Sequence, residues 1–224
     1  MAIVKFIMKS VIGGKNSAND DMAGFSLIEL MMSLVLTLII LGVAVAAFSG
    51  ALSSRERETS KTDALNSAQA AINIMSREIG NAGYGLNTNG LGWLDINGVF
   101  QTDSTNKRLH FRANTDNSNL STTGPGEDVT FYYDAASQSV VRYDKNLNVT
   151  SGIINRVSDV DFLYYNYTTG AATTTTTTPA QNTGKVNITL TVNLANVQGQ
   201  PTGQTVKFSS DVTLRNSTYM LGQY

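Results

Sequence analysis

The sequence predicts an α+β protein in which a long N-terminal helix packs on an antiparallel β-sheet. Three observations lead to this fold class. Residues 25–48 are almost entirely apolar, apolar residues within 49–83 recur at helical spacing, and 84–224 contains short runs that alternate as strands do. A chain of 224 residues is long enough for one globular domain and an additional segment.

The segment 25–48 is predicted to be the transmembrane half of the helix. From Leu30 to Phe48 only Ser33 and Thr37 are polar, and their hydroxyls can bond to the helix backbone. A membrane span needs roughly 20 such residues, whereas the apolar core of a secretory signal has about 7–15. We therefore expect a membrane anchor and not an ordinary cleaved signal.

The helix is expected to continue outside the membrane through 49–83. The charged residues at 55–58 and Lys61 have spacings that suit a solvated helix surface. Glycines between 80 and 85 are expected to end the helix near Asn81. One apolar face before that end is expected to be buried on a core: Leu65, Ala68, Ile72, Met75 and Ile79.

The segment 84–224 is predicted to be a β-rich globular domain. Apolar and polar residues alternate along its strands, so each strand would present one apolar face to a core. The helix is expected to cover that apolar face. The threonine-rich stretch 168–184 carries almost no apolar side chains, so a flexible loop is expected there. The predicted strands are 108–113, 129–133, 140–143, 160–167, 186–194 and 205–214.

Composition excludes several classes of function. Because the chain has no cysteine, it has no disulfide, thiolate nucleophile or zinc-thiolate site. A formal net charge of -1 with 15% charged residues gives no broad basic face, so no nucleic-acid partner is expected.

Glu29 is the one charged residue in the apolar segment. Insertion of a carboxylate costs roughly 2.5–3.5 kcal/mol at the centre of a span and less near its end. The carboxylate can reach water at the cytoplasmic interface. Alternatively, it can pair with the α-amino group that cleavage between Gly24 and Phe25 would create one helical turn away, or with the amine of a neighbouring copy.

Residues 24–30, Gly-Phe-Ser-Leu-Ile-Glu-Leu, resemble the processing motif of type IV pilin-like precursors. The resemblance implies that prepilin peptidase cuts after Gly24 and methylates the new N-terminus at Phe25. It also implies that Glu29 registers an incoming subunit against its neighbour. Residues 1–24 would then be the leader peptide, and a start at Met1 or at Met8 leaves the motif unchanged.

Two further stretches resemble PilW-type minor pilins. Residues 75–84, Met-Ser-Arg-Glu-Ile-Gly-Asn-Ala-Gly-Tyr, resemble their helix end, and residues 212–216, Val-Thr-Leu-Arg-Asn, resemble their closing strand. Minor pseudopilins of the type II secretion J class share this layout. The resemblance implies a pilin-like fold, partners that are other pilin or pseudopilin subunits, and a single-pass inner-membrane protein whose domain lies in the periplasm before it enters a fibre.

Residues that often carry chemistry have simpler interpretations here. His110, the only histidine, lies in an alternating strand and is interpreted as an ordinary strand residue. The run Asp95-Ile96-Asn97-Gly98 lacks the later donors of a calcium loop, so a turn is expected. Asp159 and Asp161 share a strand face and remain unassigned. Because no nucleophile, base and orienting partner occur together, we predict no enzyme activity, catalytic residue, metal or cofactor.

The predicted strands also carry several tyrosines. Strand propensity accounts for them, and a stacking face for a ligand is the alternative. These tyrosines are Tyr132, Tyr133, Tyr164, Tyr165 and Tyr167.

The function expected from these features is that of a structural minor pilin in type IV pilus assembly, priming or tip formation. One alternative is a minor pseudopilin of type II secretion. Another is a membrane-anchored periplasmic binding module or adhesin that does not polymerise and that binds through loops between Gly85 and Gly126 or through the threonine-rich stretch.

Overall fold

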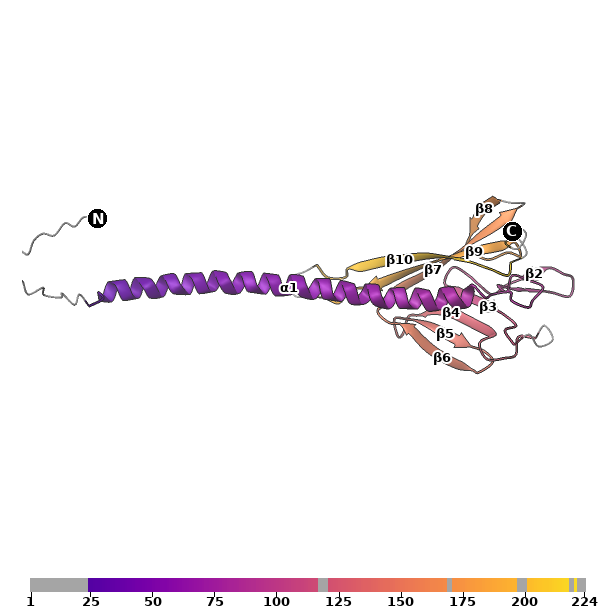
Figure 1. Cartoon of the computed structure of the whole chain (residues 1–224), viewed down its shortest axis with the longest axis horizontal. Helices are drawn as coiled ribbons and strands as arrows, with labels where there is room; N and C mark the ends of the chain where they lie inside the picture. The colour runs from indigo at the N-terminus through magenta and orange to yellow at the C-terminus, as the bar shows by residue number, and fades with distance from the viewer. Residues whose placement is uncertain (1–23, 117–120, 169–170, 197–200, 218–219, 221–224) are drawn as a thin grey trace, which may run out of the picture. The chain divides into compact units, whose positions relative to one another are not determined.

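A computed structural model describes residues 24–116, 121–168, 171–196, 201–217 and Met220. The predicted leader up to residue 23 lies outside the described residues. The chain divides into two compact units, one ending at Phe48 and the other beginning at Ser49. The described residues form a long helix and antiparallel strands (Figure 1), which confirms the predicted α+β class.

Helix α1 spans Leu27–Ile79. As predicted, the hydroxyls in its apolar part bond to the helix backbone: Ser33 Oγ donates to the Leu30 carbonyl at 2.9 Å, and Thr37 Oγ1 donates to the Ser33 carbonyl at 2.7 Å. The helix ends just before the glycines that were expected to end it, and Gly83 takes a positive φ of 78°.

The buried face of α1 lies in its C-terminal part and comprises Ala68, Ala71, Ile72, Met75 and Ile79. Leu65 was predicted on this face, but its side chain is 47% exposed, so that prediction is wrong. Ala64 packs against the core in its place. Ala64 precedes Ala68 by four residues, and the stripe then continues to Ala71 and Met75 at spacings of three and four.

The strands form two four-stranded antiparallel sheets where one sheet was expected. The first has the order β3 (Arg108–Arg112), β4 (Asp128–Asp134), β5 (Ser139–Asp144), β6 (Val149–Ile154). The second has the order β10 (Thr205–Thr213), β9 (Thr183–Asn193), β7 (Val157–Thr168), β8 (Ala171–Thr176). A two-stranded ribbon pairs β1 (Trp93–Leu94) with β2 (Phe100–Gln101).

Strands β6 and β8 were not predicted, and neither were the short β1 and β2. Most of β6 is exposed because it lies at a sheet edge, so its sequence lacks the alternation of a half-buried strand. Strand β8 lies within 168–184, and the prediction of a loop there is wrong for Ala171–Thr176. Its threonines pair with β7, with Thr175 opposite Tyr165, because β-branched residues suit an extended backbone once a partner strand is present.

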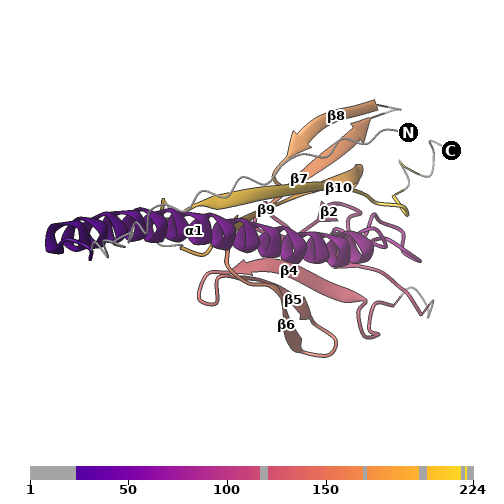
Figure 2. The ribbon, with the colours of Figure 1, turned by 60° about the vertical axis from the view of Figure 1, so that its left-hand side comes forward.

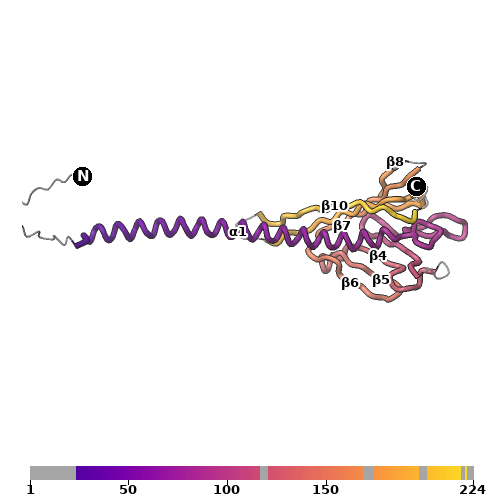
Figure 3. Tube along the Cα trace, in the orientation of Figure 1, coloured from indigo at the N-terminus to yellow at the C-terminus, as the bar shows by residue number. Residues whose placement is uncertain are grey.

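The core of the second unit lies where the C-terminal half of α1 meets both sheets. In Figures 1 and 2, the sheet with β7, β9 and β10 lies on one side of this half of the helix, and the sheet with β4, β5 and β6 lies on the other. The tube in Figure 3 follows the same path. Phe111 and Phe131 stack at a centroid distance of 5.9 Å, and Arg142 Nε donates to Glu78 Oε2 at 2.8 Å. This ion pair joins the end of α1 to β5.

Glu127, just before β4, holds its carboxylate among donors from the preceding loop. The side chain is 1% exposed and accepts hydrogen bonds from the Asp116 N–H at 2.9 Å, the Gly124 N–H at 2.8 Å and the Thr115 hydroxyl at 3.0 Å. Burial by itself raises the pKa of Glu127, but these donors outweigh it and hold the pKa below its ordinary value.

Replacing Glu127 by glutamine is expected to lower the free energy of unfolding at pH 7 by about 2 kcal/mol, because hydrogen bonds to a charged acceptor are lost. The pKa of Glu127 in the folded state lies below its ordinary value of 4.5. The ionised carboxylate therefore contributes fully to the free energy of unfolding when the pH is above 4.5, and this contribution is lost as the pH falls through the folded-state pKa. The difference between wild type and Glu127→Gln should therefore shrink in acid. Urea unfolding at pH 7 and at pH 3, followed by the fluorescence of the single tryptophan, measures it.

The exposed carboxylate of Glu58 on α1 provides the control, since Glu58→Gln should change the unfolding midpoint little at either pH. An equal loss of stability at both pH values in Glu127→Gln would contradict a role for the ionised carboxylate.

Candidate functional site

The start of α1 is the first candidate site, and a serine cap sets its position. Gly24, Phe25 and Ser26 precede the helix. Ser26 Oγ accepts the Ile28 N–H at 3.3 Å, and the Ser26 carbonyl accepts the Leu30 N–H at 3.1 Å. Ser26 is thus the N-cap residue, and Glu29 occupies the third helical position, the place of the glutamate in a capping box, without the reciprocal hydrogen bond among the described residues. The Ser-x-x-Glu pattern is a sequence signal for a helix that starts at Leu27.

The peptide bond after Gly24 is sterically accessible. A Cβ added at Gly24 would have no atom within 4 Å, and the Phe25 side chain is 83% exposed. A protease that binds extended backbone can therefore reach this bond without unfolding a packed element.

Glu29 lies in the first turn of α1, where the helix dipole favours a carboxylate. Within the described part of the chain, no hydrogen bond or ion pair engages its side chain. The carboxylate is exposed and available to a cation from outside these residues.

Among the described residues, the apolar side chains that follow Glu29 on α1 are exposed. The most apolar 18-residue window of α1 has a mean hydropathy of 2.7, and none of it is buried. By length and composition α1 is apolar enough to cross a membrane. Exposed apolar surface of this extent is typical of segments that contact lipid or other helices.

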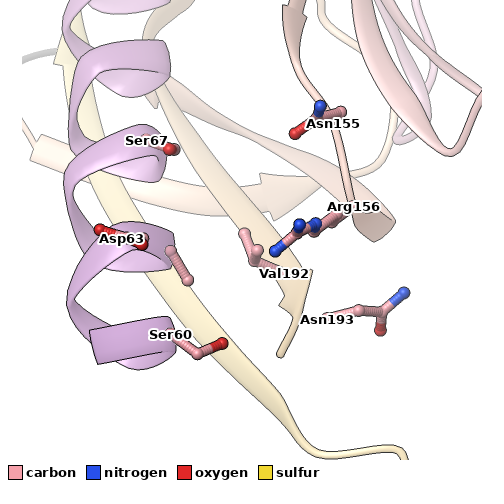
Figure 4. Close-up of a pocket in the computed structure, with 8 residues that line it drawn as sticks. Ser60, Asp63, Ser67, Asn155, Arg156, Val192 and Asn193 are labelled. Carbon is pink, nitrogen blue, oxygen red and sulfur yellow. The ribbon is translucent and has the colours of Figure 1, made fainter. Parts of the chain in front are cut away.

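A polar groove along the C-terminal half of α1 is the second candidate site (Figure 4). Its cavity of about 260 Å³ adjoins a second hollow of about 610 Å³. Figure 4 shows Ser60, Asp63 and Ser67 on the helix side and Asn155, Arg156, Val192 and Asn193 on the opposite side.

Arg156 is held in this groove by the turn between β6 and β7. Its φ is 57°, and its carbonyl accepts the Asn193 N–H at 2.7 Å. Among the ion pairs of the described residues, none joins Arg156 to Asp63, although both line the groove. The groove presents charges of both signs and contains no histidine, so it suits polar contacts better than acid–base chemistry.

His110 is buried between two carboxylates, Asp103 and Asp128, and the sequence pattern did not indicate these contacts. Its Nδ1 is 2.7 Å from Asp103 Oδ1, and its Nε2 is 2.5 Å from Asp128 Oδ1. Each ring nitrogen of His110 thus contacts a different carboxylate. Arg112 Nε also donates to Asp128, at 3.2 Å. Burial raises the pKa of Asp128, but His110, Arg112 and Lys145 outweigh it and hold the pKa below its ordinary value.

The remaining sequence candidates have structural partners. Lys107 Nζ bridges Asp159 at 2.6 Å and Asp161 at 2.7 Å, so the two carboxylates share one ammonium group. Asp95 Oδ1 accepts the N–H groups of Asn97 and Val99, which confirms the predicted turn. Among the described residues, no group of three or more histidine or acidic side chains is placed to hold a metal ion.

The tyrosines divide between the core and the surface. Tyr164 is fully buried, and its hydroxyl donates to the Thr105 carbonyl at 2.9 Å. Lys185 Nζ lies 4.1 Å from the ring centroid of Tyr165. Tyr132 and Tyr133 line a hollow beside the first sheet. Strand propensity placed these residues on strands but did not indicate that two of them border a cavity.

The comparisons with known proteins add no relative, since no protein-family model, curated protein or solved structure matches this chain.

Proposed function

We propose that this chain is a type IV pilin-like precursor of the PilW type, a minor pilin that is cut after Gly24 and takes part in pilus assembly, priming or tip formation. It acts as a structural subunit and not as an enzyme. Its partners are prepilin peptidase, the inner membrane and then other pilin subunits.

The observation that carries this proposal is the unpartnered start of α1. An accessible Gly24–Phe25 bond precedes an apolar helix with no cover, and the only charge in the apolar part is Glu29. In an ordinary membrane anchor, a carboxylate one helical turn from the end would only interact with the helix dipole or reach interfacial water. In a helix bundle built from cleaved subunits, however, the carboxylate meets an α-amino group.

Assembly would exchange lipid contacts for helix contacts. Before assembly, the apolar part of α1 lies in the inner membrane with the C-terminal domain in the periplasm. Within a fibre the same side chains pack against neighbouring helices, where van der Waals contacts replace those with lipid. Pairing of Glu29 with the amine of Phe25, in the same or an adjacent subunit, then selects one register.

The N-terminal residue of the mature protein tests this proposal directly. We expect mass spectrometry of the chain purified from its native membrane to identify N-methylphenylalanine at position 25. Processing should disappear in a strain that lacks prepilin peptidase. A mature chain that retains residues before Phe25 would refute the proposal.

The same processing is expected of a minor pseudopilin, so fibre location is the second measurement. Presence in sheared surface pili and loss of twitching on deletion support the minor pilin. Loss of protein secretion with normal pili would instead assign the chain to a secretion pseudopilus. A processed chain absent from both fibres would act as an anchored binding module.

A further inference from the structure

A hollow of about 530 Å³ borders the first sheet, and its lining includes none of the residues used in the proposed assembly function. Its volume lies within the range of small-ligand sites. Tyrosines, threonines and two cationic side chains line it: Lys107, Arg108, Thr130, Tyr132, Tyr133, Tyr143 and Thr150.

Strand register brings most of these side chains onto one face. Arg108 of β3 stands opposite Tyr132 of β4, and Tyr143 of β5 stands between Thr130 of β4 and Thr150 of β6. Directly opposed residues in antiparallel strands share a face of the sheet. Alternate residues such as Phe131 point to the core on the other face. The hollow therefore draws its lining from all four strands of this sheet.

Existing contacts hold the lining in place. Tyr143 Oη donates to Asn148 Oδ1 at 3.1 Å, and Lys107 is fixed by Asp159 and Asp161. Thr130 stands opposite His110, whose buried contact with Asp128 ties β3 to β4. A rigid lining reduces the entropy lost when a ligand binds.

The chemistry of the lining defines the ligand. It includes no aliphatic side chain, so a purely apolar ligand would leave the hydroxyl groups without partners. Carboxylates also balance the positive charges of its two cationic side chains, since Lys107 bridges two aspartates and Arg108 pairs with Asp103 at 3.5 Å. The hollow thus favours a neutral ligand that has both C–H faces and many hydroxyl groups.

We propose that this hollow binds a neutral saccharide. The C–H face of a sugar ring would lie against Tyr132 or Tyr143. Thr130 and Thr150 would exchange hydrogen bonds with its hydroxyl groups, and Arg108 would donate from the N–H groups that Asp103 leaves free. Single-stranded nucleic acid also stacks on aromatic rings, but it needs a groove of uncompensated positive charge along its backbone. This binding is independent of the proposed role in fibres.

The test is retention of neutral oligosaccharides by the full-length chain in a zwitterionic, sugar-free detergent. The probes are arrayed glycans that end in a hexose or an N-acetylhexosamine, with a single-stranded oligothymidine beside them. We expect wild type to retain a subset of the glycans. Tyr132→Ala and Tyr143→Ala should each weaken that binding about tenfold through loss of the ring surface.

Two further variants separate binding from folding. Tyr165→Ala removes a tyrosine from the other sheet and should bind as wild type does. Thr150→Arg changes an exposed position of β6 and fills the hollow, so it should abolish retention while leaving the far-UV circular dichroism and the melting temperature unchanged. The proposal is overturned if wild type retains no glycan, if retention survives Thr150→Arg, or if only oligothymidine is bound.

Discussion

Glu29→Gln is expected to remove the chain from surface fibres while cleavage after Gly24 and membrane insertion continue as in wild type. Glutamine is nearly isosteric with glutamate and preserves the Ser-x-x-Glu/Gln pattern of a capping box. It removes only the negative charge, so the start of α1 should still form at Leu27. The variant thus separates the charge of Glu29 from its position in the helix cap.

The expected loss follows from the pairing of Glu29 with an α-amino group inside a helix bundle. Breaking a buried ion pair by neutralising one partner costs roughly 3–5 kcal/mol, which corresponds to a decrease of about 100-fold or more in incorporation. Insertion into the membrane should not suffer, because a neutral side chain is no harder to insert than a carboxylate. Immunoblots of sheared fibres and of membrane fractions measure incorporation and membrane insertion, and intact-mass analysis measures cleavage after Gly24.

Glu58→Gln is the matched control, since this exposed carboxylate lies on the polar part of the same helix. It should be processed, inserted and incorporated as wild type is. Normal incorporation of Glu29→Gln together with loss of Glu29→Ala would show that Glu29 serves as a helix cap. Normal incorporation of both variants would leave Glu29 without a role in assembly.

Gly90→Ala is expected to prevent the second unit from folding, with a loss of about 4 kcal/mol or more in the free energy of unfolding. Gly90 has a φ of 78°, and a Cβ there would lie 2.1 Å from the Gly83 nitrogen and 2.4 Å from the Arg112 carbonyl oxygen. Both are backbone atoms that cannot rotate away. The Gly83 N–H donates to that same Arg112 oxygen at 2.9 Å, and the Arg112 N–H donates to the Gly90 carbonyl at 2.8 Å.

Gly98→Ala provides the comparison because Gly98 has a similar φ of 76° but no atom within 4 Å of an added Cβ. It should cost only about 1 kcal/mol, the strain of a left-handed alanine. Urea unfolding of the full-length chains in detergent, followed by tryptophan fluorescence, measures both. Similar midpoints for the two variants would show that backbone crowding at Gly90 relaxes without loss of the fold.

The sequence determined α1 and much of the strand content because these depend on local pattern. An uninterrupted apolar stretch, a change to helical spacing and a cluster of glycines predicted the helix and its end within a few residues. Alternation predicted strands at the places now occupied by β3, β4, β5, β7, β9 and β10. The site predicted at Gly24, Phe25 and Glu29 also rests on local sequence, and the structure adds only its exposure and its serine cap.

Tertiary structure decided what depends on partners distant in sequence. Alternation shows that a strand has a buried face but not which strand lies beside it, so the division into two sheets and the strand at Ala171–Thr176 could not be predicted. The side-chain contacts of His110 reach residues 7 and 18 positions away, and no periodic signal in the sequence indicates them. The tyrosine-lined hollow exists only because register places residues of four strands on one face. Local pattern sets the conformation of a segment, whereas a binding surface requires the folded chain to bring separate segments together.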